Sequence, residues 1–353
     1  MKIAIVILNY NGKKYLEQFL PSVLEYSSLK RVENETFLPE VIVADNASTD
    51  DSIPFLTTNY PDLNVIQLTE NHGFAEGYNQ VFAMIKADIF VLLNSDVEVT
   101  ENWLQPIITL MENDQNIAAC QPKIRDFHQK THFEHAGASG GFMDPLGYPF
   151  CRGRIFDTLE VDKGQYDDTQ EVFWATGAAL FIKADLYQKI GGLDGDFFAH
   201  MEEIDLCWRL RKAGYKIMVC PESTVYHVGG GTLNNENPFK TYLNFRNNLA
   251  TILKNENGWK LLLIFPIRLT LDGLAGFQFL LKGQFSNIGA VVKAHFYIYG
   301  NAFNILRKRI KSQQLVDELY IGEPRKKGKL SGSIVFKYFA FGKKKFVDLK
   351  IKD

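Results

Sequence analysis

Polar side chains follow short apolar runs in the first hundred residues. Asp45 and Asn46 follow Val41–Ala44, and Asp96 follows Ile89–Leu93. A carboxylate at the end of a buried strand can accept hydrogen bonds from a base N–H or a ribose hydroxyl, or can hold a hard divalent cation. Turn formation is the competing explanation for Asp45 and Asn46, and capping of the next helix is the competing explanation for Asp96.

A third group of such residues precedes an expected helix at 74–86. Asn71, Gly73 and Phe74 stand at its start, and Asn79 lies one turn inside. Glycine permits close backbone approach, and a helix N-terminus favours an anion such as a diphosphate. An ordinary helix start with an Asn cap has the same pattern.

The elements that position these residues alternate between strand and helix. Continuous apolar runs of this length are typical of strands that are covered on both faces, as in a parallel sheet. The pattern predicts an α/β domain, in which ligands bind outside the carboxyl ends of the strands. The expected strands are Ile3–Leu8, Val41–Ala44, Val65–Leu68 and Ile89–Leu93, and the expected helices are Lys13–Tyr26 and 74–86.

The pattern is looser beyond this region. Residues 120–170 are rich in Gly, Pro, aromatic residues and His, which is typical of a long connection that shapes a site. Regular structure returns in Val172–Ile182, a helix at Ile204–Ala213 and a strand at Ile217–Val219. A third region begins near residue 238. It has no uninterrupted run of about 20 apolar residues, so a helix lying in a membrane interface is favoured over a membrane span.

Composition excludes several classes of protein. The 353 residues are 46% hydrophobic and 23% charged, which argues against disorder, collagen and a multi-span membrane protein. The net charge of −2 combines −11 over residues 1–306 (25 basic, 36 acidic) with +9 over residues 307–353 (14 basic, 5 acidic). Four scattered cysteines without a C-x-x-C motif fit a reducing compartment, and the N-terminus lacks the features of a signal peptide.

The C-terminal region combines aromatic residues with basic clusters. Arg307–Arg309, Arg325–Lys327 and Lys343–Lys345 are interleaved with phenylalanines and Tyr338. This composition fits an amphipathic segment held to anionic lipid. A solvated basic tail with ordinary core helices is the alternative. Nucleic acid is not expected as a partner, because the body of the protein is acidic.

Seven motifs in order give the sequence a resemblance to the family 2 inverting glycosyltransferases of the GT-A fold, particularly their rhamnosyltransferase-like branch. The resemblance covers roughly residues 1–250. The motifs are Ile5–Asn11, Val43–Asp50, Asn71–Ala75, Leu92–Asp96, Trp174–Ala179, Phe197–Leu206 with Arg209 and Gly214, and Tyr226–Thr232.

The resemblance implies a role for each matching residue. Asp45 is similar to the family's base- or ribose-binding Asp. Asp96 matches the last position of the metal-binding Asp-x-Asp motif, with Asn94 in place of the first Asp, and His227 resembles a late His that binds metal or diphosphate. The other residues implied in the nucleotide pocket are Asn9, Asn11, Asn46, Asn71, Gly73, Phe74, Asn79, Asn94 and Ser95.

The resemblance also assigns catalysis. Glu202 and Glu203 match the family's Glu-Asp pair, one member of which is the general base, and Glu203 is the favoured candidate. From the residues alone, both could be first-turn acids favoured by the helix dipole, with Asp205 paired to Arg209. The residues implied on the acceptor and sugar side are Trp174, Thr176, Gly177 and Asp205.

The expected function is transfer of one sugar, with inversion, from a nucleotide-diphosphate donor (dTDP-rhamnose, a UDP-hexose or a GDP-hexose) to a lipid-linked or growing glycan. Mg²⁺ or Mn²⁺ is the implied cofactor. The expected fold is a Rossmann-like, mostly parallel sheet flanked by helices, with residues 1–250 as the GT-A domain and 251–353 as a helical, membrane-associating extension. The expected location is cytoplasmic, peripheral on the inner face of the cell membrane.

Two other functions remain open at this point. One is a catalytically inactive, membrane-associated scaffold that binds nucleotide sugars with the same fold, which Asn94 and Glu203 leave possible. The other is a sugar-nucleotide pyrophosphorylase, which should have a Gly-rich, Arg-containing loop after the first strand. Asn9–Gly12 does not have that composition.

Overall fold

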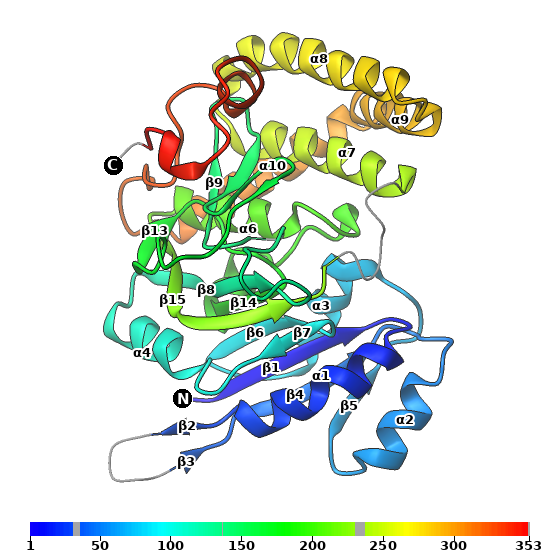
Figure 1. The fold of residues 1–353 in the computed structure, drawn as a ribbon, viewed down its shortest axis with the longest axis vertical. Coiled ribbons are helices and arrows are strands. Elements are labelled where there is room, and N and C mark those ends of the chain that lie inside the picture. The colour runs from blue at the N-terminus through cyan, green and yellow to red at the C-terminus, as the bar shows by residue number, and fades with distance from the viewer. Residues whose placement is uncertain (31–35, 136, 230–236, 352–353) are drawn as a thin grey trace.

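A mixed β-sheet covered by helices on both faces forms the centre of the protein (Figure 1). The computed structural model describes residues 1–353 except 31–35, 136, 230–236 and 352–353. The order across the main sheet is β13 (Gln170–Val172), β15 (Lys216–His227), β8 (Ile117–Asp126), β14 (Ala179–Lys183), β6 (Ile89–Asn94), β1 (Ile3–Asn9), β4 (Glu40–Asp45) and β5 (Asn64–Gln67), with β7 (Val97–Val99) paired to β15.

The strands around β1 are parallel, as predicted. Strand β1 pairs in parallel with β4 and β6, and β4 pairs in parallel with β5. The polar residues that end β1, β4 and β6 therefore emerge at one edge of the sheet. Strand β14 runs antiparallel to both β6 and β8, which makes the sheet mixed.

Alternate residues of β1 face opposite layers of helices. Ile3, Ile5 and Ile7 pack in a core with α1, α2 and α4, while Ala4 and Val6 pack in a second core with α3, α5 and α6. Both faces are buried, which is why the strand is apolar at every position before its last residue, Asn9. The helices are α1 (Lys13–Tyr26), α2 (Ser52–Asn59), α3 (Gly73–Met84), α4 (Gln105–Asn113), α5 (Ala184–Lys189) and α6 (Glu202–Lys212).

The region 120–170 is more regular than expected. Strand β8 extends into it, and a small antiparallel sheet follows. Its strands have only two or three residues each, too few for a periodic pattern in the sequence. They are β9 (Gly141–Met143), β10 (Pro149–Cys151), β11 (Arg154–Ile155) and β12 (Thr158–Leu159). A separate short hairpin joins β2 (Leu29–Lys30) to β3 (Thr36–Phe37).

Two other predicted segments differ in length from the strands observed there. Val172–Ile182 is divided between the end of β13 and most of β14 by an irregular segment, and the strand expected at Ile217–Val219 continues to His227 as β15. All four cysteines are buried and unpaired.

Four helices form a layer on one side of the domain (Figure 1). They are α7 (Pro238–Asn255), α8 (Gly258–Leu281), α9 (Phe285–Gly300) and α10 (Ala302–Glu318). Helix α7 packs between α6, α9 and α10, and α10 also contacts α6. The predicted boundary at residue 250 therefore falls inside α7. Among the described residues, α8 alone is long and apolar enough to cross a membrane by length and composition.

The C-terminal tail returns along the domain and packs on the β9–β12 sheet. The Arg325 guanidinium binds the Glu171 carboxylate, and the Leu330 N–H donates to Met143 O at 2.9 Å. Phe346 packs against Phe142, with 4.7 Å between ring centroids. Part of the aromatic content of the tail therefore belongs to the protein core, while Lys343–Lys345 remain exposed.

Candidate active site

The loops after β1 and β4 form one hydrogen-bonded cluster. Asn9 Nδ2 donates to Asp45 Oδ1 at 3.0 Å, and the Ser48 N–H donates to Asp45 Oδ2 at 2.9 Å. Asn11 Oδ1 accepts from the Thr49 N–H at 2.7 Å. The prediction that these loops lie side by side is confirmed. Asn9 Oδ1 is buried without a partner, which leaves an acceptor in this crevice.

Asn46 joins the third loop to this cluster. Its Nδ2 donates to Asn71 Oδ1 and to Gly73 O, both at 3.0 Å, and its Oδ1 accepts from the His72 N–H. Ser95, after β6, is adjacent to the β1 loop, because a Cβ on Gly12 would lie 3.3 Å from its Oγ. All four strand-end loops therefore meet at one edge.

The start of α3 differs from the expectation of an anion site. The N–H groups of Phe74 and Ala75 both donate to Phe198 O, at 2.6 and 3.2 Å. Gly73 has φ 72°, and a Cβ there would lie 2.5 Å from the Phe198 ring. The close approach at Gly73 is therefore made by Phe198, and these amide groups are not free for a diphosphate.

Asn79 makes its hydrogen bonds within the protein. Its Nδ2 donates to Glu76 and to Leu193 O, and its Oδ1 accepts from the Tyr187 hydroxyl and the Leu193 N–H. These contacts connect α3 with the segment that follows α5. Asn79 thus has a structural role beside the crevice.

Asp96 and His227 lie together, although 131 positions separate them in the sequence. His227 Nε2 is 3.1 Å from Asp96 Oδ1, and His227 Nδ1 is 3.2 Å from Glu134 Oε2. Burial alone would lower the pKa of His227, but the two carboxylates outweigh burial and raise it well above its ordinary value. Asn94 completes the group, with its Nδ2 3.5 Å from His227 Nε2. Sequence reasoning missed Glu134, which lies in the irregular region 120–170.

No all-protein metal site is present in the part of the chain that the structure describes: no group of three or more His, Cys, Asp and Glu side chains there has a suitable arrangement. Asp96 and His227 form a pair of potential ligands, with Asn94 beside them. This is fewer protein ligands than a structural metal centre uses.

The adjacent carboxyl groups of Glu202 and Glu203 begin helix α6. Burial and the neighbouring Glu203 carboxyl raise the pKa of Glu202 well above its ordinary value. Burial also raises the pKa of Glu203 to about 7. Each residue has one buried carboxyl oxygen, Oε2, without a hydrogen-bond partner. A buried carboxyl group with free acceptor capacity and a raised pKa has the properties of a general base or acid.

Glu203 is connected to the Asp96 group through a small-residue turn. A Cβ on Gly177 would lie 3.9 Å from Glu203 Cβ and 3.1 Å from the Phe74 ring. The next residue, Ala178, accepts a hydrogen bond from the Asn94 N–H through its carbonyl oxygen at 3.0 Å. The turn thus separates the carboxylates from the Asn94–Asp96 strand end by a single layer of backbone.

Two residues expected on the acceptor side are largely structural. Trp174 packs its indole over Gly141 and donates from Nε1 to Phe142 O at 3.0 Å. Thr176 is buried, and its backbone N–H donates to Gln121 Oε1. These contacts hold the Gly177 turn in place.

Asp205, expected on the acceptor side, is fully buried in an ion-pair cluster. Its Oδ2 lies 3.0 Å from both Arg209 Nε and Lys254 Nζ, and its Oδ1 accepts from Asn255 Nδ2 at 2.7 Å. Burial would raise the pKa of Asp205, but Lys254 and Arg209 outweigh burial and hold it below its ordinary value. No oxygen of this carboxylate is exposed to a substrate.

The strand-end loops of the mixed sheet carry carboxylates and amides at one edge, and an acidic pair lies on the opposite side of a glycine turn. This arrangement defines a glycosyltransferase of the GT-A fold. The sequence profile of glycosyl transferase family 2 matches residues 4–186, and the chain belongs to that family.

Individual relatives agree with this assignment. The N-acetylglucosaminyl-diphospho-decaprenol L-rhamnosyltransferase of Mycobacterium tuberculosis is 23% identical over 286 residues, which cover 77% of this chain and 89% of that protein. The chain is therefore similar to a rhamnosyltransferase, the branch expected from the motifs.

Solved structures share the fold. A mannosyltransferase from Pyrobaculum calidifontis, in complex with GDP-Man and Mn²⁺, has a TM-score of 0.51 at 14% identity, covering 90% of this chain and 84% of that one. GalNAc-T7 with UDP, GalNAc and Mn²⁺ has a TM-score of 0.54 at 14% identity. That match covers 74% of this chain and 49% of GalNAc-T7, so the present chain spans about half of the latter.

Proposed function

We propose that this glycosyltransferase transfers one sugar, with inversion, from a nucleotide-diphosphate donor to a lipid-linked or growing glycan. The observation that carries the proposal is the position of Glu203, half-buried beside the Gly177 turn, whose next residue, Ala178, is hydrogen-bonded to Asn94. In a single displacement, the acceptor hydroxyl must lose a proton on one side of the sugar while negative charge develops on the leaving diphosphate on the other side.

Each part of the site has a role in this reaction. Asp45, with Asn9, Asn11, Asn46 and Asn71, would hold the nucleoside at this edge of the sheet. Glu203 would accept the acceptor proton, and Glu202 would keep the pKa of the pair high by like-charge repulsion. The other residues expected in the pocket are Gly73, Phe74 and Ser95, which line the same edge.

A divalent cation, Mg²⁺ or Mn²⁺, would be held by Asp96, and by His227 once the cation has displaced the proton that Asp96 and Glu134 stabilise on its ring. The 3.1 Å between Asp96 Oδ1 and His227 Nε2 matches the separation of about 3 Å between adjacent ligands in an octahedron with bonds of about 2.1 Å. Hard cations of this kind are commonly held by one or two carboxylates together with substrate phosphates, so the small protein ligand set is compatible with the role. When bound, the cation would neutralise charge on the leaving diphosphate.

Replacement of Asp96 by asparagine tests the metal site. We expect Asp96→Asn to raise the Mn²⁺ concentration needed for donor binding by about tenfold or more, because loss of even an outer partner of a metal ligand has effects of that size. Calorimetric titration of the donor at a series of Mn²⁺ concentrations measures this shift. Asp126→Asn is the control, since Asp126 pairs with His227 in strand register but lies outside the cluster. Equal Mn²⁺ dependence of donor binding in the two variants would show that Asp96 is not a metal ligand.

The donor and the activity itself are tested by a panel. The name of the mycobacterial relative supports rhamnose as the sugar and a diphosphate-linked lipid as the acceptor. Purified protein with Mn²⁺ is screened by thermal shift against dTDP-rhamnose, UDP-hexoses and GDP-hexoses, since a ligand that binds the folded state raises its apparent stability. Donors that bind are then assayed for turnover. If no donor in the panel binds, the proposal is contradicted. If a donor binds but is neither transferred nor hydrolysed, the inactive scaffold is favoured.

A large apolar surface on the C-terminal helices supports membrane association, on the cytoplasmic side as the sequence predicts. We define the helical apolar face by the exposed side chains of Trp259, Leu262, Leu263, Leu274, Phe277, Leu281, Phe285, Phe296, Phe303 and Ile310. Exposed apolar side chains gathered on successive helices are typical of interaction sites. Lys260 of α8, Lys282 directly after α8, and Arg307 and Lys311 of α10 add positive charge, which suits the headgroups of an anionic membrane.

Charge placed on this face should release the protein from vesicles. We expect the double variant Leu262→Glu/Phe296→Glu to sediment less with phosphatidylglycerol vesicles, because each glutamate must be desolvated to enter the interface. Leu38→Glu is the matched control, since Leu38 is 71% exposed but lies on the catalytic domain. Equal sedimentation of both variants would exclude the helical apolar face as the membrane contact.

A further inference from the structure

The segment before α6 has an unusual backbone. We call residues 194–201 the pre-α6 loop, because Glu202 and Glu203 follow it directly. Three of its residues other than glycine have positive φ: Phe198 at 64°, His200 at 70° and Met201 at 76°. Phe198, with ψ −60°, is the centre of a tight turn in which the Ala199 N–H donates to Phe197 O at 2.7 Å. Side chains rarely tolerate these conformations unless the surroundings impose them.

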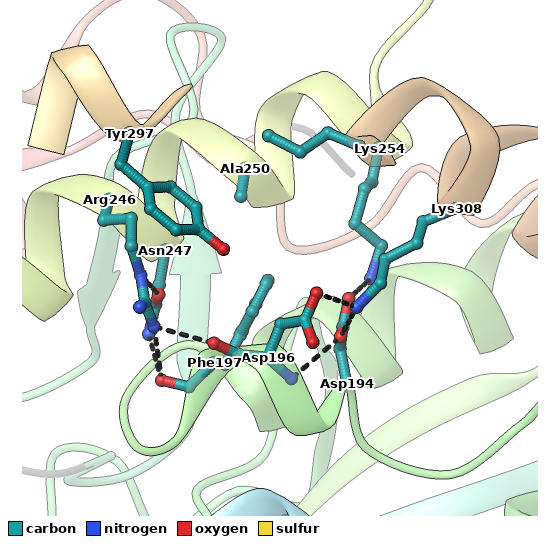
Figure 2. A pocket seen from close by; sticks show the side chains of 10 residues that line it. Asp194, Asp196, Phe197, Arg246, Asn247, Ala250, Lys254, Tyr297 and Lys308 are labelled. Atoms are coloured by element: carbon teal, nitrogen blue, oxygen red, sulfur yellow. Dashed lines mark hydrogen bonds and ion pairs between the residues drawn. The ribbon is translucent and has the colours of Figure 1, made fainter. Parts of the chain in front are cut away.

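Two consecutive residues of α7 impose this conformation. Asn247 is fully buried, and its Nδ2 lies within hydrogen-bond distance of Phe197 O, Ala199 O and His200 O, at 2.9, 2.9 and 2.8 Å. Arg246 Nη2 donates to Asp196 O at 2.9 Å and to Phe197 O at 2.8 Å. Arg246 Nε in turn donates to Asn247 Oδ1 at 2.7 Å, which fixes the orientation of the amide. Figure 2 shows both side chains directed at the loop.

The first residue of the loop is held by lysines from two other positions of the C-terminal helices. Asp194 lies 2.6 Å from Lys254 Nζ in α7 and 2.5 Å from Lys308 Nζ in α10 (Figure 2). Lys254 also contacts Asp205, one turn inside α6. Both ends of the segment that carries the acidic pair are thus attached to the C-terminal helices.

The same loop also contacts the donor side. Phe198 O caps the start of α3, and the Phe198 ring lies over Gly73 and against Phe239 of α7. A shift of the loop would therefore move Glu203 and the beginning of α3 together.

We propose that Asn247, oriented by Arg246, is a positioning residue for sugar transfer: it holds the pre-α6 loop in its left-handed conformation and so fixes the place of Glu202 and Glu203 relative to the donor. This inference rests on the proposed function, in which the acidic pair removes the acceptor proton. The C-terminal helices then contribute to catalysis in addition to any contact with a membrane.

The test compares two neighbouring asparagines of α7. Asn247→Ala removes the amide from the pre-α6 loop. Asn248→Ala removes an equally buried amide whose Nδ2 donates to Gly147 O and whose Oδ1 accepts from Arg268, away from the acidic pair. We expect both to lower the melting temperature. Only Asn247→Ala should lower kcat, by about 10²-fold, because a displacement of about 1 Å in a catalytic group has effects of that size. Its donor KM should change less than kcat, since the pre-α6 loop reaches the nucleoside loops only through the contacts of Phe198 at the start of α3.

Hydrogen exchange gives a readout that does not depend on turnover. Peptides covering residues 195–201 should exchange faster in Asn247→Ala than in Asn248→Ala. Equal exchange in this segment, or equal kcat in the two variants, would overturn the proposal. Should Asn247→Ala fail to fold, Arg246→Lys is used in its place, because it keeps the charge but loses the contact with Asp196 O and Phe197 O. Exchange or kcat equal to that of Asn248→Ala would then overturn the proposal. If neither Glu203→Gln nor Glu202→Gln lowers kcat, the proposed function fails, whereas the exchange comparison still reports whether Asn247 holds the loop.

Discussion

Replacing Glu203 by glutamine should lower kcat by about 10²- to 10⁴-fold, the range contributed by a positioned general base. Glutamine has the same shape and keeps the packing against the Gly177 turn, but it cannot accept a proton. Calorimetry of donor binding serves as the control, since the nucleoside loops do not include this side chain. Glu202→Gln should have the smaller effect on kcat. The reverse order would make Glu202 the base.

The pH dependence of the reaction follows from the same residue. The base acts in its ionised form, and burial raises the pKa of Glu203 to about 7. Activity should therefore be low in acid and rise as the pH increases through about 7. A profile of kcat/KM against pH measures this, and in Glu203→Gln the residual activity should no longer show that rise. A wild-type profile already flat from pH 5 would contradict a buried carboxyl base.

Removing the Asp205 carboxylate should have the largest effect on stability. We expect Asp205→Ala to lower the free energy of unfolding by about 3 kcal/mol or more, because Lys254 and Arg209 are left buried with a partner missing. Urea denaturation followed by circular dichroism measures this loss. The control is Asp185→Ala, which breaks an exposed i,i+4 pair with Lys189 and should cost less than about 1 kcal/mol.

The two interpretations of Asp205 make opposite predictions. A residue that contacts the acceptor would, when replaced, raise the acceptor KM and leave the urea midpoint near that of Asp185→Ala. A residue that holds α6 to α7 would shift the midpoint. The ion pairs to Lys254 and Arg209 favour the second outcome.

Local patterns in the sequence predicted the parallel part of the fold well. Strands such as β1 and β6 are buried on both faces, so every position before the final Asn is apolar and the run is recognisable without a partner. The helix at Lys13–Tyr26 was also predicted at its observed limits. The β9–β12 sheet was not recognised, because strands of two or three residues have no period, and its pairing depends on contacts far along the chain.

In the candidate site, too, some residues could be predicted from the local sequence and others could not. The crevice formed by Asn9, Asp45 and Asn46 was predicted, since neighbouring parallel strands end at a common edge. Glu134 was not, because nothing in its local sequence indicates that it approaches His227. The anion site at α3 was expected from the helix start alone. The sequence around Gly73 gives no sign that Phe198 O, more than a hundred residues away, accepts from those amides.

The path of the C-terminal tail has a consequence for biosynthesis. Phe142 and Phe150 pack against Phe346, so this part of the core closes only after Phe346 has left the ribosome. At about 5–20 residues per second, translation from Phe142 to Phe346 takes on the order of ten to forty seconds. During that interval the nascent chain exposes an aromatic surface to which chaperones can bind. A premature stop codon before Phe346 would therefore leave Phe142 and Phe150 without this contact.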